Sequence, residues 1–429
     1  MGVFILPFFC GFDFGTSNTV VTLISSDDGN TEISNSHAEV PAKVFSDSSL
    51  LFLPDSRPYA QRRYVGQEAV DEYVRSNMNG RFIQSIKSIL PDSDFLFTII
   101  FEKRYTAPDL VAMIIRSFKN RIEDFLGREI DAAVFGRPVR FSNVDDEDSL
   151  AQERLCKAAE KCGFKDIALQ YEPVAAASRY AMDMKVETTG IVCDFGGGTT
   201  DFSVIRLERD RSIKALASHG VRVGGDDFDG RIMWHRIVKY FGYGTVYESY
   251  GHMLPVPVHI FRTICRWERI AFLKTLQYRD DLKYIHNGAV DKLAIKRLMS
   301  LIDEDLGFSL FQAIRAAKHR LSDSDTAAVR FFERGIELKE RISRADFGEF
   351  IAEELANVNR AMNETLRLAG VQKAEIHTAF LTGGSSLVQV LRDAITRDFR
   401  DAEMLYDTDR FNTVSLGLAI QARELQKAV

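Results

Sequence analysis

Residues 190–201 read GIVCDFGGGTTD, and this stretch decides the fold. An apolar run leads to Asp194, three consecutive glycines follow, and Asp201 opens a second apolar run that ends at Leu207. This pattern predicts two strands joined by a tight turn. Three glycines weaken a sheet unless another group must approach the backbone closely. We therefore expect the turn to present backbone N–H groups to a ligand.

A second turn of the same form lies at residues 11–18, which read GFDFGTSN. Glycines flank Asp13, and Thr16 and Ser17 add hydroxyl donors. Successive N–H groups in such a turn form a concavity that binds anions such as phosphate. An aspartate beside phosphate is repelled unless a cation lies between them. The turn therefore predicts Mg²⁺ near Asp13, held mainly through water because Mg²⁺ loses its hydration shell reluctantly.

The two turns are expected to face each other across one cleft and to hold phosphates from both sides. Asp13 and Asp194 are 194 − 13 = 181 positions apart, which favours two lobes of related fold over an array of short repeats. A third glycine turn, residues 380–386 (FLTGGSS), follows a strand-like run and suits a backbone approach to a nucleoside. Gly-Gly is common in such turns, so this one adds little by itself.

The composition excludes several other classes of protein. A chain of 429 residues predicts two or more domains. A net charge of −6 offers no basic face to nucleic acid. The five cysteines are odd in number and lack C-x-x-C spacing, which argues against disulfides or zinc and favours a cytoplasmic location. No apolar run reaches the roughly 18 residues of a membrane helix, so we expect no membrane partner. We also expect the protein to be a monomer.

Taken in order, the three turns resemble the phosphate-one, phosphate-two and adenosine motifs of the actin, sugar-kinase and heat-shock ATPase superfamily. Further segments narrow the resemblance to the DnaK-type heat-shock protein 70 family. They are residues 65–69 (VGQEA), 85–90 (SIKSIL), 171–177 (YEPVAAA) and 223–229 (VGGDDFD). The resemblance covers nearly the whole sequence. Because nothing in it matches the family's hydrophobic linker or β-sandwich substrate domain, the chain is similar to the short YegD-like homologues, and peptide clamping of the usual form is not expected.

The resemblance implies a role for each matching residue. Asp13, Asp194 and Asp201 would surround Mg²⁺ and its waters. Lys87 would orient the attacking water and stabilise charge on the γ-phosphate, while Glu172 would bind a metal-bound water and report the nucleotide state to the hinge. The implied catalytic residues are Lys87, Glu172, Asp194, Thr199 and Asp201. The implied nucleotide-binding residues are Gly15, Thr16, Ser17, Asn18, Gly196, Gly197, Gly198, Thr200, Gly224, Gly225, Lys318, Ser322, Gly383, Gly384 and Ser385.

Two positions depart from the family pattern. Arg315 stands three residues before the adenosine lysine, where the family usually has glutamate. Leu387 follows the third turn, where an arginine usually stacks on adenine. The choice and affinity of nucleotide therefore stay open. Pro138 and Arg154, in contrast, match the family's switch proline and its arginine partner.

The resemblance implies an α/β protein of the actin-like ATPase fold, with two lobes. Each lobe is expected to have a related mixed sheet, flanking helices and a smaller inserted subdomain. The expected first lobe comprises core residues 1–40 and 107–188 with an insertion at 41–106. The expected second lobe comprises core residues 189–226 and 312–429 with an insertion at 227–311.

The expected function is a slow ATPase that closes its lobes on Mg·ATP and relaxes after hydrolysis to ADP, in the manner of a chaperone nucleotide switch. A client protein or co-chaperone would read the closure, and the resemblance also allows a K⁺ ion. Two alternatives stay open. One is a small-molecule kinase of the same superfamily, although no separate sugar motif is visible. The other is a nucleotide-dependent filament subunit or scaffold.

Overall fold

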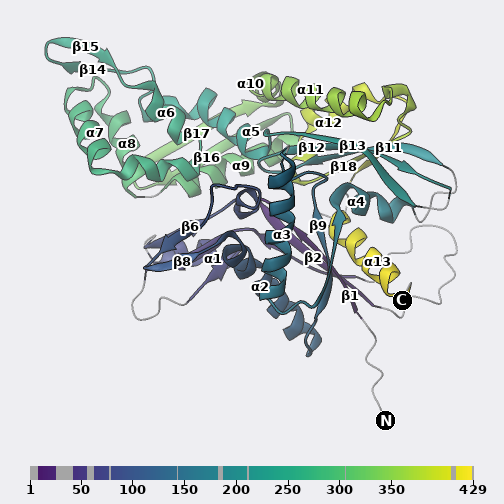
Figure 1. The fold of residues 1–429 in the computed structure, drawn as a ribbon. Helices are drawn as coiled ribbons and strands as arrows, with labels where there is room; N and C mark the ends of the chain where they lie inside the picture. Colours follow the sequence, from purple (N-terminus) through teal and green to yellow (C-terminus); the bar gives the residue numbers. More distant parts are fainter. Residues whose placement is uncertain are drawn as a thin grey trace.

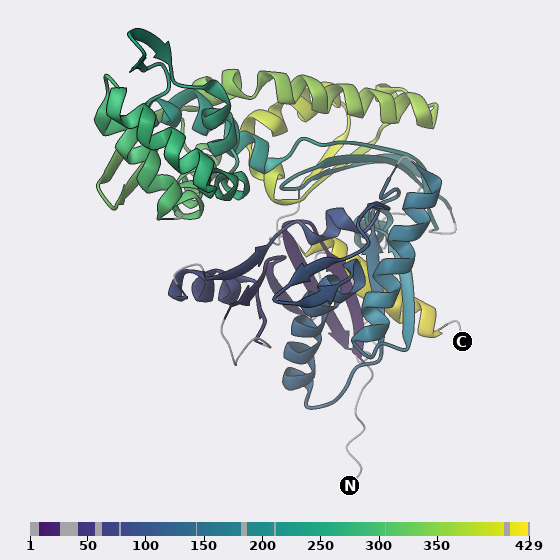
Figure 2. The ribbon, with the colours of Figure 1, turned by 60° about the vertical axis from the view of Figure 1, so that its left-hand side comes forward.

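The computed structural model describes most of the chain, and Figure 1 shows its two α/β lobes. The described ranges are 8–25, 42–55, 62–76, 79–142, 144–181, 187–209, 212–304, 306–406 and 412–427. The predicted first-lobe boundary at residue 40 lies outside these ranges. The purple and blue part of the first lobe lies below the green part of the second lobe in both Figure 1 and the turned view of Figure 2.

The first lobe is built on a mixed five-stranded sheet. Its strands are β1 (Phe8–Phe14), β2 (Asn18–Ser25), β3 (Ala42–Ser48), β9 (Ala132–Arg137) and β10 (Asp166–Tyr171). They lie in the order β10-β9-β1-β2-β3, with antiparallel pairing from β1 to β3 and parallel pairing of β1, β9 and β10. The predicted hairpin around residues 11–18 is the β1–β2 turn.

The second lobe repeats this topology. Its strands are β11 (Thr188–Phe195), β12 (Thr200–Leu207), β13 (Ile213–Val221), β18 (Thr378–Thr382) and β19 (Glu403–Tyr406). The order β19-β18-β11-β12-β13 again joins an antiparallel trio to two parallel strands. The prediction of two related mixed sheets is therefore confirmed.

Helices cover both faces of the first sheet. Alternate side chains of β1 point to opposite faces, as in any strand. Phe12 and Phe14 enter a core shared with α2 and α3, whereas Phe9 packs against α13. The helices of this lobe are α2 (Ala107–Leu126), α3 (Asp145–Lys161), α4 (Glu172–Ala181) and α13 (Thr413–Lys427). Among the helices within the described ranges, none has the length and hydropathy of a membrane span.

Smaller elements are inserted into each lobe. Those of the first lobe are β4 (Leu51–Pro54), β5 (Tyr64–Val65), α1 (Gln67–Arg75), β6 (Gly80–Ile83), η2 (Ile86–Ile89), β7 (Thr98–Ile100) and β8 (Lys103–Tyr105). The second lobe continues through α5 (Gly225–Ile232), η3 (Met233–Ile237), η4 (Val238–Phe241), β14 (Val246–Ser249), β15 (His252–Pro255), α6 (Val258–Ile264), η5 (Trp267–Lys274), α7 (Leu276–Gly288), α8 (Lys292–Asp303) and α9 (Gly307–Asp323).

The remaining elements of the second lobe are β16 (Thr326–Glu333), β17 (Ile336–Ser343), α10 (Arg344–Phe350), α11 (Ala352–Ala369), η6 (Lys373–Glu375), η7 (Gly384–Leu387) and α12 (Gln389–Asp398). One continuous core joins the second sheet to the inserted helices, from Ile191 and Phe202 to Leu298 and Phe311. The insertion is therefore packed onto its lobe rather than attached by a free linker.

Strand pairing and packing correct three details of the predicted segments. β3, which the boundary at 41 placed in the insertion, pairs with β2 in the main sheet. The β16–β17 hairpin, which was placed in the second core, forms its own two-stranded sheet beside α9. Helix α13, which was also placed in the second core, packs against β1, β2, β9 and α4 of the first lobe. The other predicted boundaries between lobe cores and insertions stay predictions.

Helix α13 packs so closely against α4 that there is no room for a side chain at Gly417. A Cβ at this position would overlap the carbonyl oxygen of Ala175 in α4. Gly→Ala inside a helix ordinarily stabilises by about 1 kcal/mol. We expect Gly417→Ala to do the opposite and to lower the unfolding temperature, because overpacking costs about 1–3 kcal/mol.

The matched control is Gly348→Ala in α10. A Cβ there would meet Val390 at 3.6 Å, which is ordinary van der Waals contact. We expect this variant to unfold at or above the wild-type temperature in a thermal melt. An equal response of the two variants would contradict the packing of α13 against α4.

Candidate nucleotide site

The glycine turns of the two lobes meet. In β1, Asp13 pairs with Val20 one position before the turn. In the second lobe, Asp194 and Asp201 face each other across the β11–β12 hairpin. A Cβ on Gly197 would overlap Ser17 Oγ, so the tips of the two hairpins touch. The predicted juxtaposition of the two phosphate turns across the lobes is therefore present in the structure.

Two other turns of the second lobe donate hydrogen bonds to the β11–β12 turn, at residues 196–197. Gly225 N–H donates to the Gly196 carbonyl oxygen at 3.1 Å, and Asp226 N–H donates to that of Gly197 at 2.8 Å. From the third turn, Ser385 Oγ donates to Gly196 O at 3.0 Å. The sheet itself sets this approach, because β18 runs parallel to β11 and ends beside it.

The predicted residues of these turns take different positions. Thr200 is buried, and its hydroxyl donates to Val223 O at 2.8 Å, which leaves only its backbone for a nucleotide. Thr199 Oγ is hydrogen-bonded to the Asp201 carboxylate. Gly15 O accepts a hydrogen bond from Ser49 Oγ at 2.7 Å.

The first and third turns hold the remaining predicted residues. Thr16 and Ser17 are half-buried in the first turn, and Asn18 opens β2 with an exposed side chain. Gly383 has a φ of 80°, a conformation that favours glycine, and Gly384 begins η7.

Lys87 and Glu172 form a largely buried ion pair. The Nζ–Oε1 distance is 2.8 Å, and the two side chains are 12% and 13% exposed. Lys87 lies in η2, and Glu172 is the first residue of α4. Arg154 in α3 holds the end of η2, since its guanidinium donates to the carbonyl oxygens of Ile89 and Leu90 at 3.1 and 2.9 Å. Three elements that are distant in sequence thus place this pair.

Burial raises the pKa values of the three aspartates. The pKa of Asp13 rises to about 8, with Glu172 adding to the effect of burial. The pKa of Asp194 rises to about 7 and that of Asp201 to about 6, again through burial first and Glu172 second. Burial alone would lower the pKa of Lys87, but the carboxylates of Glu172 and Asp13 outweigh it and raise that pKa. These mutual effects show that the five groups share one site.

This charge distribution fits a divalent cation. Four carboxyl groups lie near a single lysine within the site, and the raised pKa values of three of them mean that a bound cation would favour their ionised forms. Across the described ranges, no three His, Cys, Asp or Glu side chains are close enough to form a ready-made set of metal ligands. The excess of carboxyl groups over positive groups fits Mg²⁺, which usually keeps several of its waters and needs few protein ligands.

The predicted adenosine residues form a second, adjoining group. Lys318 Nζ donates to Gly225 O at 2.7 Å and lies 2.8 Å from Asp229 Oδ1, a contact without hydrogen-bond geometry. Arg315 pairs with Asp226 at 3.1 Å and with Asp229 at 3.5 Å. One helical turn beyond Lys318, the buried Oγ of Ser322 has no hydrogen-bond partner among the described residues.

The two departures noted in the sequence fall at this end of the site. The orphaned Ser322 hydroxyl and the buried Lys318 are suited to a polar ligand such as a ribose. Arg315 is already paired with two carboxylates. Leu387, which is 36% exposed, presents an apolar surface.

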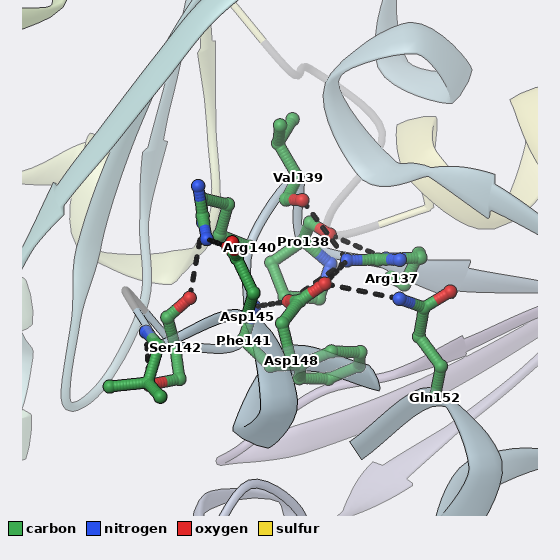
Figure 3. A network of polar contacts seen from close by, with 10 residues as sticks. Arg137, Pro138, Val139, Arg140, Phe141, Ser142, Asp145, Asp148 and Gln152 are labelled. Atoms are coloured by element: carbon green, nitrogen blue, oxygen red, sulfur yellow. Dashed lines mark hydrogen bonds and ion pairs between the residues drawn. The ribbon is translucent and has the colours of Figure 1, made fainter. Parts of the chain in front are cut away.

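A cavity of about 290 Å³ adjoins Glu172, Asp194 and Asp201. These three side chains line one part of it, and residues 138–142 and 218–222 form much of the remaining wall. Figure 3 shows the polar network behind residues 138–142, which is centred on Arg137 and Asp148. This loop follows β9 directly, so the end of β9 determines the shape of the cavity wall.

Sequence reasoning missed two residues at the end of β9, directly before this wall. A Cβ on Gly136 would lie 3.2 Å from Glu172 Cγ, so this glycine limits where Glu172 can sit. Arg137 is buried and pairs with Asp148. The available signal was a Gly-Arg-Pro run at the end of an apolar strand, in which an arginine stands where the strand pattern calls for a buried residue.

Comparison with known proteins identifies related sequences. A family model described as "Hsp70 protein" matches residues 54–245 and 299–428. A "Chaperone protein HscA homolog" of Azotobacter vinelandii (strain DJ / ATCC BAA-1303) is 27% identical over 430 residues. Another, from Pseudomonas paraeruginosa (strain DSM 24068 / PA7), is 28% identical over 437 residues. Each alignment covers 97% of this chain and 57% of the relative, so the chain spans little more than half the length of these proteins.

Proposed function

The chain belongs to the Hsp70 family, and from this premise we propose that it binds Mg·ATP between its lobes and hydrolyses it slowly as a chaperone-type nucleotide switch. The single observation that carries the proposal is the meeting of Asp13, Asp194, Asp201, Lys87 and Glu172 at the contact between two glycine turns. Phosphoryl transfer needs mainly positioning and charge stabilisation, and this group of residues supplies both.

The carboxylates of Asp13, Asp194 and Asp201 would hold Mg²⁺, mainly through water. When bound, the ion neutralises negative charge on the phosphate oxygens. A lysine ammonium has three N–H donors, and Lys87 uses one of them on Glu172. The other two are the donors that we assign to the γ-phosphate and the attacking water. Glu172, held by Lys87, would orient a water bound to the metal.

The glycine turns would bind the rest of the nucleotide. We assign the γ-phosphate to Gly197, Gly198 and Thr199, since the Gly196 N–H already donates to Thr199 O at 2.9 Å. Ser17 closes the site from the first lobe. On the adenosine side, we assign the ribose to Lys318 and Ser322.

The wider context is also part of the proposal. Lobe closure would be read by a client protein or co-chaperone, as in a chaperone switch. All five cysteines are unpaired, which supports a reducing compartment such as the cytoplasm. A monomer is the expected working form, and a K⁺ ion beside the phosphates stays an expectation from the family.

The test compares the wild type with Asp13→Ala and Asp194→Asn. Both variants remove a carboxylate from the cluster, and we expect ATP turnover to fall by roughly 100-fold in each. Asp280→Asn is the control, because that side chain is 77% exposed and pairs only at the surface. ATP binding is measured by calorimetry and turnover by phosphate release. Equal binding and turnover in wild type and both cluster variants would refute the proposal.

Further readouts on the wild type distinguish the proposed ATPase from the alternative functions. A burst of ADP that depends on an added sugar would indicate a small-molecule kinase. A rise in light scattering when ATP is added would indicate a filament subunit. ATP that stays bound without turnover would indicate a scaffold.

A further inference from the structure

Arg137 is a buried arginine at a junction of the site. It is the last residue of β9, is 6% exposed, and pairs in register with Tyr171, the last residue of β10. The next residues along the two strands are Pro138, which begins the cavity wall, and Glu172. The guanidinium therefore lies where both segments leave the sheet.

One guanidinium fixes the backbone of the cavity wall. Arg137 Nε donates to Pro138 O at 2.9 Å, and Nη2 donates to Val139 O at 3.0 Å. Nη2 also contacts both oxygens of Asp148, at 3.0 and 2.9 Å. Figure 3 shows these contacts converging from the loop and from α3. A buried arginine is costly unless it is paired and hydrogen-bonded, and these four contacts engage its Nε and Nη2 donors.

Asp148 completes the network from the other side. Its Oδ1 accepts the Phe141 N–H at 2.6 Å, and its Oδ2 accepts Gln152 Nε2 at 3.0 Å. Residues 138–141 are thus held at their start by Arg137 and at their end by Asp148.

The guanidinium also contacts two aromatic rings. Its carbon lies 5.3 Å from the ring centroids of Phe141 and of Tyr171. Contacts of this kind are attractive, and arginine makes them better than lysine because its guanidinium is planar. Through Tyr171 the contact reaches the residue directly before Glu172. Arg137 therefore touches both segments that carry Pro138 and Glu172.

We propose that Arg137 is a positioning residue for ATP hydrolysis, which sets the cavity wall and Tyr171 so that Glu172 meets Lys87. This inference rests on the proposed function. The space available to the Glu172 side chain is narrow, because Gly136, which precedes Arg137 in β9, lies close to Glu172 Cγ. A small displacement of β9 or β10 at this end therefore changes the Glu172–Lys87 contact of 2.8 Å.

The decisive variant is Arg137→Lys, which keeps the charge but loses the planar fork. We expect kcat for ATP to fall by roughly 10- to 100-fold, since a displacement near 1 Å can cost 100-fold. The Kd for ATP, measured separately, should change by less than about threefold, because the phosphate turns are not altered. Arg75→Lys is the matched control, as the Arg75 side chain is 73% exposed.

Two further variants test the same idea without changing the guanidinium. Asp148→Asn weakens the opposite end of the network, and Gly136→Ala places a Cβ 3.2 Å from Glu172 Cγ and 3.1 Å from Leu418 Cδ1. Both should lower kcat more than they change the Kd for ATP. All assays run well below the unfolding temperature of each variant, so loss of stability by itself does not lower kcat. If Arg137→Lys does not fold, Asp148→Asn decides the question, because it weakens the Arg137 network itself; wild-type kcat in that variant would then overturn the inference.

The outcomes separate the inference from the proposed function. If the wild type hydrolyses ATP and Arg137→Lys has the wild-type kcat, the inference is overturned and the proposed function stands. If Arg137→Lys only lowers the unfolding temperature, Arg137 supports the fold alone and the inference also fails. If the wild type has no ATP turnover that Asp194→Asn abolishes, both fail.

Discussion

Replacing Lys87 with methionine is expected to lower the ATP turnover rate by roughly 100-fold or more, as the loss of a buried donor to a transition state does. The Lys87 ammonium is the cation that faces Asp13, Asp194 and Glu172 in the described site. Methionine keeps the length of the side chain but removes all of its N–H donors. ATP should still bind, because the glycine turns and the adenosine side are unchanged.

The measurement is phosphate release at saturating Mg·ATP, with binding followed by calorimetry. Lys165→Met is the control, since the Lys165 side chain is 77% exposed and lies just before β10, at the end of that strand opposite Glu172. Lys87→Arg, which keeps the charge, should retain more activity than Lys87→Met. Wild-type turnover in Lys87→Met would remove Lys87 from the mechanism while leaving the aspartate test in place.

Replacing Asp229 with alanine is expected to cause the largest loss of stability among the variants considered. Asp229 is fully buried and lies 2.8 Å from Lys318 Nζ, which is 6% exposed. Removing one partner of a buried pair leaves an uncompensated charge, at a cost of about 3–5 kcal/mol. The unfolding temperature of Asp229→Ala should therefore fall by several degrees in a thermal melt.

A double variant tests the cause of that loss. Asp229→Ala with Lys318→Met replaces the buried pair by apolar groups and should recover much of the lost stability. Asp280→Ala is the surface control, because exposed ion pairs contribute about 0–1 kcal/mol. If Asp229→Ala melted like Asp280→Ala, the buried pair would not be a stabilising contact of the second lobe.

Local features of the fold were accessible from the sequence because short-range chemistry sets them. The runs around Asp13 and Asp194 predicted two hairpins, and β1–β2 and β11–β12 are those hairpins. Glycine turns and apolar runs specify such units within about ten residues. The meeting of the turns followed from one electrostatic argument, that aspartates beside phosphates require a shared cation.

Features that depend on distant partners were not accessible in this way. An apolar stripe near the end of the chain predicts a helix, but it does not say which lobe will cover it. Helix α13 crosses to the first lobe because Gly11 and Gly417 allow its backbone to approach β1 and α4 closely. The sequence alone does not show whether the space beside a glycine is open to solvent or is occupied by the backbone of another element.

The sequence by itself determined the two hairpins and the family to which the chain belongs, and it predicted the residues that would touch phosphate and metal. Only the tertiary structure decided that Arg137 is buried between two strand ends and that its partner is Asp148. It also decided that the Thr200 hydroxyl faces the protein interior. The physical reason is that the free energy of a charged or polar side chain depends on its partners in space, and periodicity along the chain does not name those partners.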